Sequence, residues 1–185
     1  MEIKRELIKQ YIVNFALPED AQKIREVWYR AWLSTYPSKE YGITREEIKE
    51  KLQELLSKKA LKKYAESIRN PQPGQYLIVA RENGKIFGMC SARRMSDKNT
   101  LQALYVDPQF QGMGMGMALW EKARQCFDPK NKTFSNVAFY NKKGIRFWKK
   151  VGFVETGKQG IHEKTKLRFG IKIPVMGIVR PEEER

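Results

Sequence analysis

The sequence predicts a single domain of the α/β (α+β) class with the element order βααβββαβαββ. Two kinds of segment alternate along the chain: short runs rich in apolar residues, and longer runs whose apolar residues recur at helical spacing. An Asn83-Gly84 pair separates two of the short runs, which is the strongest short-range signal for a β-hairpin. A third short run ends in a glycine-rich loop that leads directly into a helix-forming segment. Together these observations predict a mixed domain.

The N-terminal part is predicted to hold one strand and two helical regions. Residues 11–16 form the first expected strand, and a helix with an apolar stripe follows over 18–34. Thr44 and Glu47 have the spacing of a capping box and open a second helix. That helix, or a helix pair, continues to about residue 69, where a Pro- and Gly-containing loop ends it.

The rest of the chain alternates strands with two more helices. The expected elements, in chain order, are strands over 76–81, 85–92 and 101–106, a helix ending near 127, a strand over 133–139, a helix opened by Asn141, and strands over 153–156 and 164–179. No repeat, linker or low-complexity tract divides the chain. We therefore expect one domain over 1–180, followed by a charged tail over 181–185.

Composition limits the class of protein. The chain has 185 residues, two cysteines and one histidine, and it contains no signal-like segment and no long apolar segment. These features predict a soluble cytoplasmic protein with free thiols and no membrane association. Cys90 and Cys126 are expected to be small core residues. A metal site is not expected, and His162 is expected in an exposed loop.

A loop lies between the predicted strand over 101–106 and the helix that ends near 127. It has the spacing Q-x-x-G-x-G, formed by Gln111, Gly114 and Gly116, with a further glycine at 112. Alternate glycines disfavour both helix and strand, but they let a ligand approach bare backbone amides. Those amides lie at a helix N-terminus, where the dipole also favours an anion. The loop therefore predicts a phosphate-binding site.

Two common phosphate-binding motifs do not fit this loop. A P-loop needs a Gly-Lys-Ser/Thr sequence, which occurs nowhere in the chain. The dinucleotide motif G-x-G-x-x-G fails at Met117, where a third glycine is required, and no acidic residue follows over 132–138 to bind a ribose.

The loop instead resembles that of the GCN5-related N-acetyltransferase (GNAT) family. The first shared motif is a strand ending in Leu104-Tyr105-Val106 followed by the loop from Gln111 to Gly116. The second is an Asn that opens a helix closing with an aromatic pair and a Gly-Phe, here Asn141 to Phe153. The resemblance covers roughly residues 11–175.

The resemblance implies a GNAT fold, which is a mixed, mostly antiparallel twisted sheet of six to seven strands with helices on both faces. It also implies acetyl-CoA as the cofactor, bound where two central strands separate after Val106. The implied coenzyme contacts are Leu104, Tyr105, Val106, Gln111, Gly112, Met113, Gly114, Met115, Gly116, Met117, Asn141 and Trp148. Within this set the amides of residues 112–117 hold the pyrophosphate, and Leu104–Val106 offers backbone groups to the pantetheine arm.

Two positions depart from the family pattern. Trp148 stands where the family usually has a tyrosine that protonates the leaving thiolate, and an indole cannot do this. Asn136 stands where some relatives have a glutamate base. Tyr140 is the candidate substitute acid, and a bound water is the candidate base. Trp148 has a second interpretation as a core aromatic beside Phe147.

The sequence says less about which residues bind the acceptor amine. Residues 28–37 resemble the first helix and loop of the polyamine-acetylating group, which makes Trp32 and Tyr36 candidate substrate contacts. A helix face packed in the core is an equal alternative for Trp32. Glu40, Glu46 and Glu47 are candidates for an acidic element that would suit a polyamine.

The net charge is +15, with 36 basic and 21 acidic side chains. Residues 128–180 hold 13 basic and 3 acidic ones. This excess suits either a nucleic acid or the phosphates of the coenzyme, for which Lys142 and Lys143 are candidates, and a lysine-rich composition explains part of it.

The expected function is direct transfer of an acetyl group from acetyl-CoA to a primary amine, either a small molecule or a protein amine. The alternatives are a non-catalytic acyl-CoA-binding module of the same fold and an RNA- or ribosome-associated basic protein, the last of which is not favoured. The sequence is compatible with a monomer or a homodimer.

Overall fold

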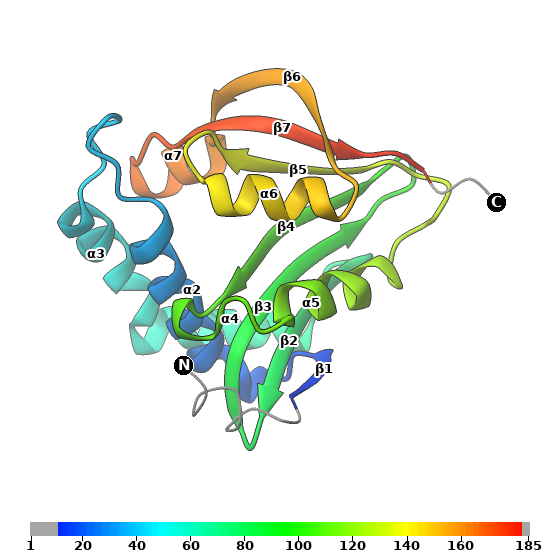
Figure 1. Ribbon diagram of the computed structural model, residues 1–185. Coiled ribbons are helices and arrows are strands. Elements are labelled where there is room, and N and C mark those ends of the chain that lie inside the picture. The colour runs from blue at the N-terminus through cyan, green and yellow to red at the C-terminus, as the bar shows by residue number, and fades with distance from the viewer. Residues whose placement is uncertain (1–10, 183–185) are drawn as a thin grey trace.

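The computed structural model describes residues 11–182, and these form one seven-stranded sheet with helices on both faces (Figure 1). The strands are β1 Ile12–Phe15, β2 Gln75–Glu82, β3 Lys85–Arg94, β4 Asn99–Val106, β5 Thr133–Ala138, β6 Val154–Ile161 and β7 Pro174–Arg180. The helices are η1 Pro18–Asp20, α2 Ala21–Thr35, α3 Arg45–Gln53, η2 Glu54–Leu56, α4 Lys58–Arg69, η3 Pro108–Phe110, α5 Met115–Arg124, α6 Lys142–Lys150 and α7 Glu163–Phe169. This architecture confirms the predicted fold class.

The sheet has the strand order β1-β2-β3-β4-β5-β7-β6. Every neighbouring pair is antiparallel except β4 and β5, which are parallel. These two strands pair only at Asn99↔Thr133 and Thr100↔Phe134. One further contact, a 2.8 Å hydrogen bond donated by the Ser135 hydroxyl to the Leu101 carbonyl, marks the point of separation. The strands therefore separate several residues earlier than the expected position after Val106.

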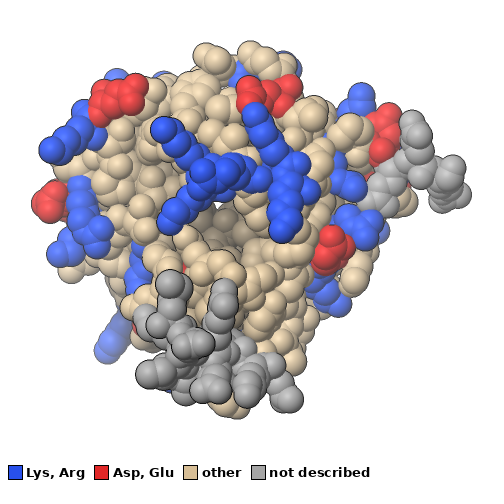
Figure 2. Space-filling model, viewed as in Figure 1, with Lys and Arg blue, Asp and Glu red and all other residues tan. Residues whose placement is uncertain are grey.

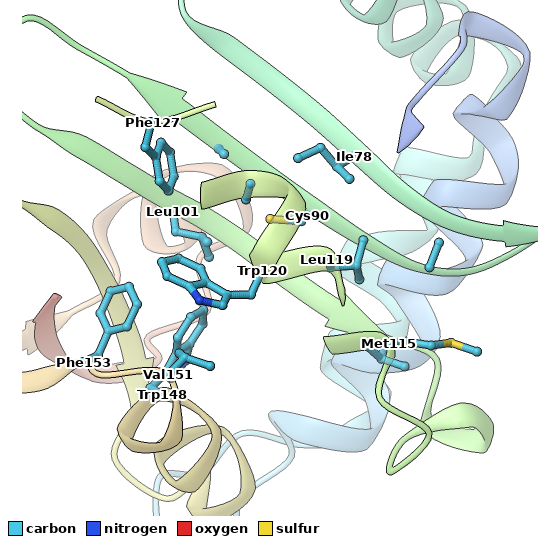
Figure 3. Close-up of a cluster of buried hydrophobic side chains, with 14 of the residues drawn as sticks. Ile78, Cys90, Leu101, Met115, Leu119, Trp120, Phe127, Trp148, Val151 and Phe153 are labelled. Carbon is cyan, nitrogen blue, oxygen red and sulfur yellow. The ribbon is translucent and has the colours of Figure 1, made fainter. Parts of the chain in front are cut away.

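The two faces of the sheet are covered by different helices. Figure 1 shows α5 and α6 on one face and α2, α3 and α4 on the other. Side chains alternate accordingly along β3, since Cys90 packs in the cluster beneath α5 whereas Met89 packs beneath α2. The α5–α6 cluster centres on Trp120, Trp148 and Phe153 (Figure 3), whose rings meet edge to face at 5.0–5.3 Å between centroids.

The hairpin between β2 and β3 has the turn that its sequence predicts. Asn83 and Gly84 both have positive φ, at 48° and 72°. Positive φ at both central residues is the requirement of a type I′ turn, which matches the twist of the flanking strands.

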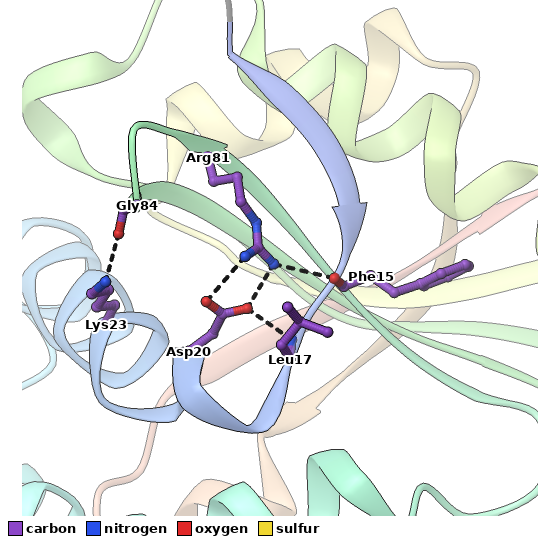
Figure 4. A network of polar contacts seen from close by, with 6 residues as sticks. All are labelled: Phe15, Leu17, Asp20, Lys23, Arg81 and Gly84. Carbon is purple, nitrogen blue, oxygen red and sulfur yellow. Dashed lines mark hydrogen bonds and ion pairs between the residues drawn. The ribbon is translucent and has the colours of Figure 1, made fainter.

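A buried ion pair anchors the start of α2 to the sheet (Figure 4). The Arg81 guanidinium on β2 donates to Asp20 at 2.6 and 3.2 Å and also to the carbonyl of Phe15. Asp20 in turn accepts from the amide of Leu17 at 2.7 Å. Because both charges are largely buried and hydrogen-bonded, this pair holds the N-terminal end of α2, and its C-terminal end extends toward the separation of β4 and β5.

The structure corrects one expected element. The predicted strand over 164–179 is wrong in its first part, because Glu163–Phe169 forms α7 and the last strand begins only at Pro174. His162 caps α7, and Gly170, with φ of 72°, ends it. The strand expected over 153–156 is longer and runs to Ile161. The second helical region is a helix pair, α3 and α4, joined by η2.

Candidate functional site

A cavity of about 830 Å³ lies where β4 and β5 separate. Its walls come from β4, β5, the N-terminal ends of α5 and α6, the C-terminal part of α2, and α7. All the predicted site residues line it except Met113: Trp32, Tyr36, Leu104, Tyr105, Val106, Gln111, Gly112, Gly114, Met115, Gly116, Met117, Tyr140, Asn141 and Trp148. The fold thus brings together predicted residues from three separate stretches of the chain, 32–36, 104–117 and 140–148.

The glycine loop requires its glycines for two different reasons. Gly112 and Gly114 have φ of 84° and 82°, a conformation that side chains with a Cβ rarely adopt. Gly116 has an ordinary φ, but a Cβ there would lie 3.3 Å from the Phe147 ring of α6. The helix begins at Met115, so the first-turn N–H groups of α5 have no partner within the helix. The loop therefore presents backbone donors at the positive end of a helix dipole.

Side chains before the loop hold it in place. The buried carboxylate of Asp107 accepts from the amide of Gln109 at 3.1 Å and from Arg30 Nε of α2 at 2.7 Å. The amide side chain of Gln111 donates to the carbonyl of Val106 at 3.3 Å. These bonds tie the end of β4 to both the loop and α2, which fixes the mouth of the cavity between them.

The N-terminus of α6 forms the opposite border. Asn141 Oδ1 accepts from the Gly144 amide at 2.9 Å, which confirms the predicted N-cap. Lys142, Lys143 and Lys150 line the rim and are exposed. Figure 2 shows basic side chains gathered over α6 at the edge of a hollow. No aspartate or glutamate lines the cavity within the described residues, so the rim carries positive charge only.

Three tyrosines, at the C-terminal end of α2, on β4 and just after β5, are linked across one wall of the cavity. The Tyr36 and Tyr105 hydroxyls are 3.0 Å apart, and the Tyr140 hydroxyl donates to the Tyr36 carbonyl at 2.9 Å. Burial raises the pKa of Tyr36 well above its usual range and also raises that of Tyr105. Burial, with a smaller contribution from Tyr41, raises the pKa of Tyr140 to about 12. All three hydroxyls therefore keep their protons at neutral pH.

Aromatic rings form most of this wall. Trp32 lies 4.6 Å from Trp28 and 4.7 Å from Tyr36 between ring centroids, and Phe169 of α7 closes the group. The Trp32 indole N–H lies near the Tyr105 hydroxyl and offsets part of the burial-driven rise in the pKa of Tyr105, yet no acceptor meets hydrogen-bonding geometry with that N–H. The two interpretations of Trp32 are compatible, because it is buried in a core cluster and also lines the cavity. The same holds for Trp148.

Sequence reasoning missed the contribution of α7. His162, Thr165, Arg168 and Phe169 all line the cavity. His162 was expected in an exposed loop, but it is half-buried, and its Nδ1 lies 2.8 Å from the Thr165 hydroxyl. Two local signals in the sequence could have predicted α7. His162 stands three residues before Thr165, the spacing of an N-cap, and Gly170 is a residue type that ends helices.

Other candidates lie away from the cavity. Glu40, Glu46 and Glu47 do not line it, so they supply no acidic element there. Neither Cys90 nor Cys126 lines it, and burial raises the pKa of both thiols. Within residues 11–182 no group of three or more His, Cys, Asp or Glu side chains is placed to hold a metal ion. Over the same residues, no helix has the length and apolar character needed to span a membrane.

The family model of the acetyltransferase (GNAT) domain matches residues 39–167. The chain therefore belongs to the GNAT family of acetyltransferases. No curated protein matches the sequence.

Solved structures with this fold include three acetyltransferases. The PaiA N-acetyltransferase from Thermoplasma acidophilum, in complex with coenzyme A, is 20% identical with a TM-score of 0.68, over 91% of this chain and 98% of that one. The ribosomal-protein-S18-alanine N-acetyltransferase from Escherichia coli is 14% identical with a TM-score of 0.62, over 95% and 96%. A GNAT acetyltransferase from Streptococcus pneumoniae is 19% identical with a TM-score of 0.64, over 92% and 99%. At these identities the likeness shows the fold.

Proposed function

We propose that this enzyme binds acetyl-CoA in the cavity between β4 and β5 and transfers the acetyl group directly to a primary amine. Two features of the same cavity carry the proposal. One is the glycine loop at the N-terminus of α5, residues 111–116, which we call the glycine cradle. The other is the cavity rim formed by Lys142, Lys143 and Lys150, which has no acidic side chain among the described residues. A diphosphate needs both features, because backbone donors bind its oxygens and cations neutralise its charge.

The residues fit a nucleotide thioester along the whole cavity. Gly112 leaves open space where a side chain would block a phosphate, because nothing lies within 4 Å of a Cβ built there, whereas a Cβ at Gly114 would lie 3.5 Å from the Tyr11 hydroxyl. Lys142 and Lys143 lie in the first turn of α6, where cations oppose the helix dipole, and a bound phosphate would offset that cost. Along β4, residues Leu104–Val106 pair with β3 on one edge and border the space left by β5 on the other. Backbone groups on that second edge are available to the pantetheine arm, apart from the Val106 carbonyl, which accepts from Gln111.

The coenzyme supplies an activated thioester carbonyl. In the transfer, the amine nitrogen bonds to the acetyl carbon, the carbon–sulfur bond breaks, and the amine proton is balanced by protonation of the departing thiolate. Tyr140 Oη is our candidate donor, because its raised pKa keeps it protonated and it lines the cavity with Asn136. To donate there, it must release the carbonyl of Tyr36. Trp148 packs between Phe147 and Phe153, so it shapes the cavity wall but cannot protonate the thiolate.

Direct transfer agrees with the distribution of nucleophiles. Both cysteines lie outside the cavity, and their raised pKa values disfavour the thiolate needed for an acyl-enzyme. Holding the amine and the thioester together supplies a large part of the rate in such a mechanism. The two free cysteines also support a reducing compartment such as the cytoplasm.

A second candidate function is a non-catalytic acyl-CoA-binding module. Trp148 and Asn136 favour it, because neither side chain can serve as the acid or base that the transfer needs.

Thermal melting with and without acetyl-CoA, followed by thiol release with a panel of amines, separates these functions. A ligand at 100 times its Kd should stabilise by about 2.7 kcal/mol, which shifts Tm by several degrees. A shift with amine-dependent thiol release supports the enzyme, and a shift without release supports the module. An absent shift contradicts both and favours RNA binding, which a salt series would then detect.

A further inference from the structure

Two arginines near the α2–α7 end of the cavity have no carboxylate partner among the described residues. Arg168 of α7 lines the cavity beside Phe169, and Arg25 of α2 lies one turn before Trp28. Neither forms an ion pair with any carboxylate of residues 11–182. The nearest acid on α7, Glu163, contacts Lys166 at 3.9 Å instead.

Both guanidinium groups rest on aromatic rings that pack together. The Arg25 guanidinium lies 3.8 Å from the Tyr64 ring centroid and 5.4 Å from that of Trp28. The Arg168 guanidinium lies 5.1 Å from that of Phe169. Because the ring centroids of Trp28 and Phe169 are 6.2 Å apart, the two guanidinium groups contact adjoining rings of one aromatic cluster.

This arrangement is electrostatically unfavourable without an anion. Burial lowers the pKa of Arg25, the neighbouring Tyr64 offsets part of that shift, and the positive charge of Arg168 lowers the pKa further. A carboxylate placed at Arg168 would neutralise one charge and reduce the repulsion of the other. The guanidinium fork matches the two oxygens of a carboxylate, so the geometry favours that anion.

We propose that the α2–α7 end of the cavity binds the carboxylate of an amino-acid-like acceptor through Arg168, with Arg25 adding long-range attraction. This inference rests on the proposed function and names its substrate class. The aromatic wall of Trp28, Trp32 and Phe169 suits an apolar or aromatic side chain on that acceptor. The unpaired indole N–H of Trp32 offers a further donor for an acceptor oxygen.

The same charges disfavour a polyamine. A polyamine carries several positive charges, and no aspartate or glutamate lines the cavity among the described residues to receive them. An aromatic amino acid instead brings one anion to the arginine and one amine to the thioester.

The test compares acceptors that differ only in the carboxylate: phenylalanine with phenethylamine, and tryptophan with tryptamine. The wild-type enzyme is expected to favour the amino acid in kcat/KM by about 10-fold or more, the range for a hydrogen bond to a charged group. In Arg168→Gln that preference should disappear through loss of activity toward the amino acid alone. Lys166→Gln is the matched control, because it removes an exposed cation of α7 that does not line the cavity.

Product binding gives a readout that does not depend on turnover. With coenzyme A present, N-acetylphenylalanine should quench tryptophan fluorescence at lower concentration than N-acetylphenethylamine, and Arg168→Gln should equalise the two. Equal use of both acceptors, or an unchanged preference in Arg168→Gln, overturns the carboxylate site while the acetyltransferase stands. If no amine is acetylated, the proposed function fails separately, and product binding still decides the carboxylate site.

Discussion

Replacing Gly112 by alanine tests the glycine cradle at its most exposed point. Gly112 has φ of 84°, and a Cβ there would meet no atom within 4 Å. The cost to the free protein is therefore conformational, about 1–2 kcal/mol for an L-residue in the left-handed region. For a chain of this size that lowers Tm by roughly 2–8 °C. The added methyl group lies in the open space that we assign to the pyrophosphate, so coenzyme A affinity should fall by about 10- to 100-fold.

Gly157→Ala is the matched control. Gly157 has φ of 75°, has nothing within 4 Å of its Cβ, and does not line the cavity. It should lose similar stability and keep wild-type coenzyme affinity, measured by isothermal titration calorimetry well below both Tm values. Equal coenzyme Kd values for Gly112→Ala and the wild type would refute the assignment of the cradle.

Three further predictions concern protons, thiols and the anchor of α2. The raised pKa values of the buried tyrosines mean that the folded chain holds these protons more tightly than the unfolded one; their stabilisation is full below about pH 10 and is lost as pH rises toward 12. Melting from pH 8 to 11.5 should show that loss, with a shallower decline in Tyr140→Phe, and an identical slope would contradict it. Cys126→Ala should retain the wild-type kcat, because Cys126 lies outside the cavity, and a large loss would indicate an acyl-enzyme. Asp20→Asn leaves the largely buried Arg81 charge without its partner and should cost about 3 kcal/mol in urea unfolding, whereas a change below 1 kcal/mol would show that the pair is not a structural anchor.

The features that were predictable from sequence are those set by neighbouring residues. The hairpin at Asn83-Gly84, the glycine loop and the Asn141 cap each depend on a few adjacent positions with special backbone requirements. For this reason the residues on the glycine-loop side of the cavity could be named from the sequence, while their contacts with the coenzyme stay a prediction.

The part of the cavity lined by α2 and α7 could not be predicted in the same way. Helix α7 has no apolar stripe, since Leu167 is 81% exposed, and its caps rather than its periodicity define it. The bond between Tyr140 and Tyr36 joins residues 104 positions apart, which only the fold brings together. Trp32 and Trp148 stayed ambiguous because the cavity wall is continuous with the core, so one apolar pattern describes both.

Because Trp148 and Asn136 replace the tyrosine and glutamate that occur in the family, few side chains in the cavity can act as an acid or a base. The cavity offers protonated tyrosine hydroxyls, one histidine bound to Thr165 and positioned backbone, but no carboxylate within the described residues. In the proposed mechanism, positioning of the two reactants therefore carries a larger share of the rate than proton transfer, and we expect modest turnover.

Incubation with acetyl-CoA labelled with ¹³C in the acetyl group, followed by mass spectrometry of both the amine and the intact protein, decides whether the chain transfers acetyl directly. We expect the label on the amine nitrogen, one acetylated amine for each thiol released, and an unchanged protein mass. A label that accumulates on the protein before it reaches the amine, or thiol release without an acetylated amine, would contradict direct transfer.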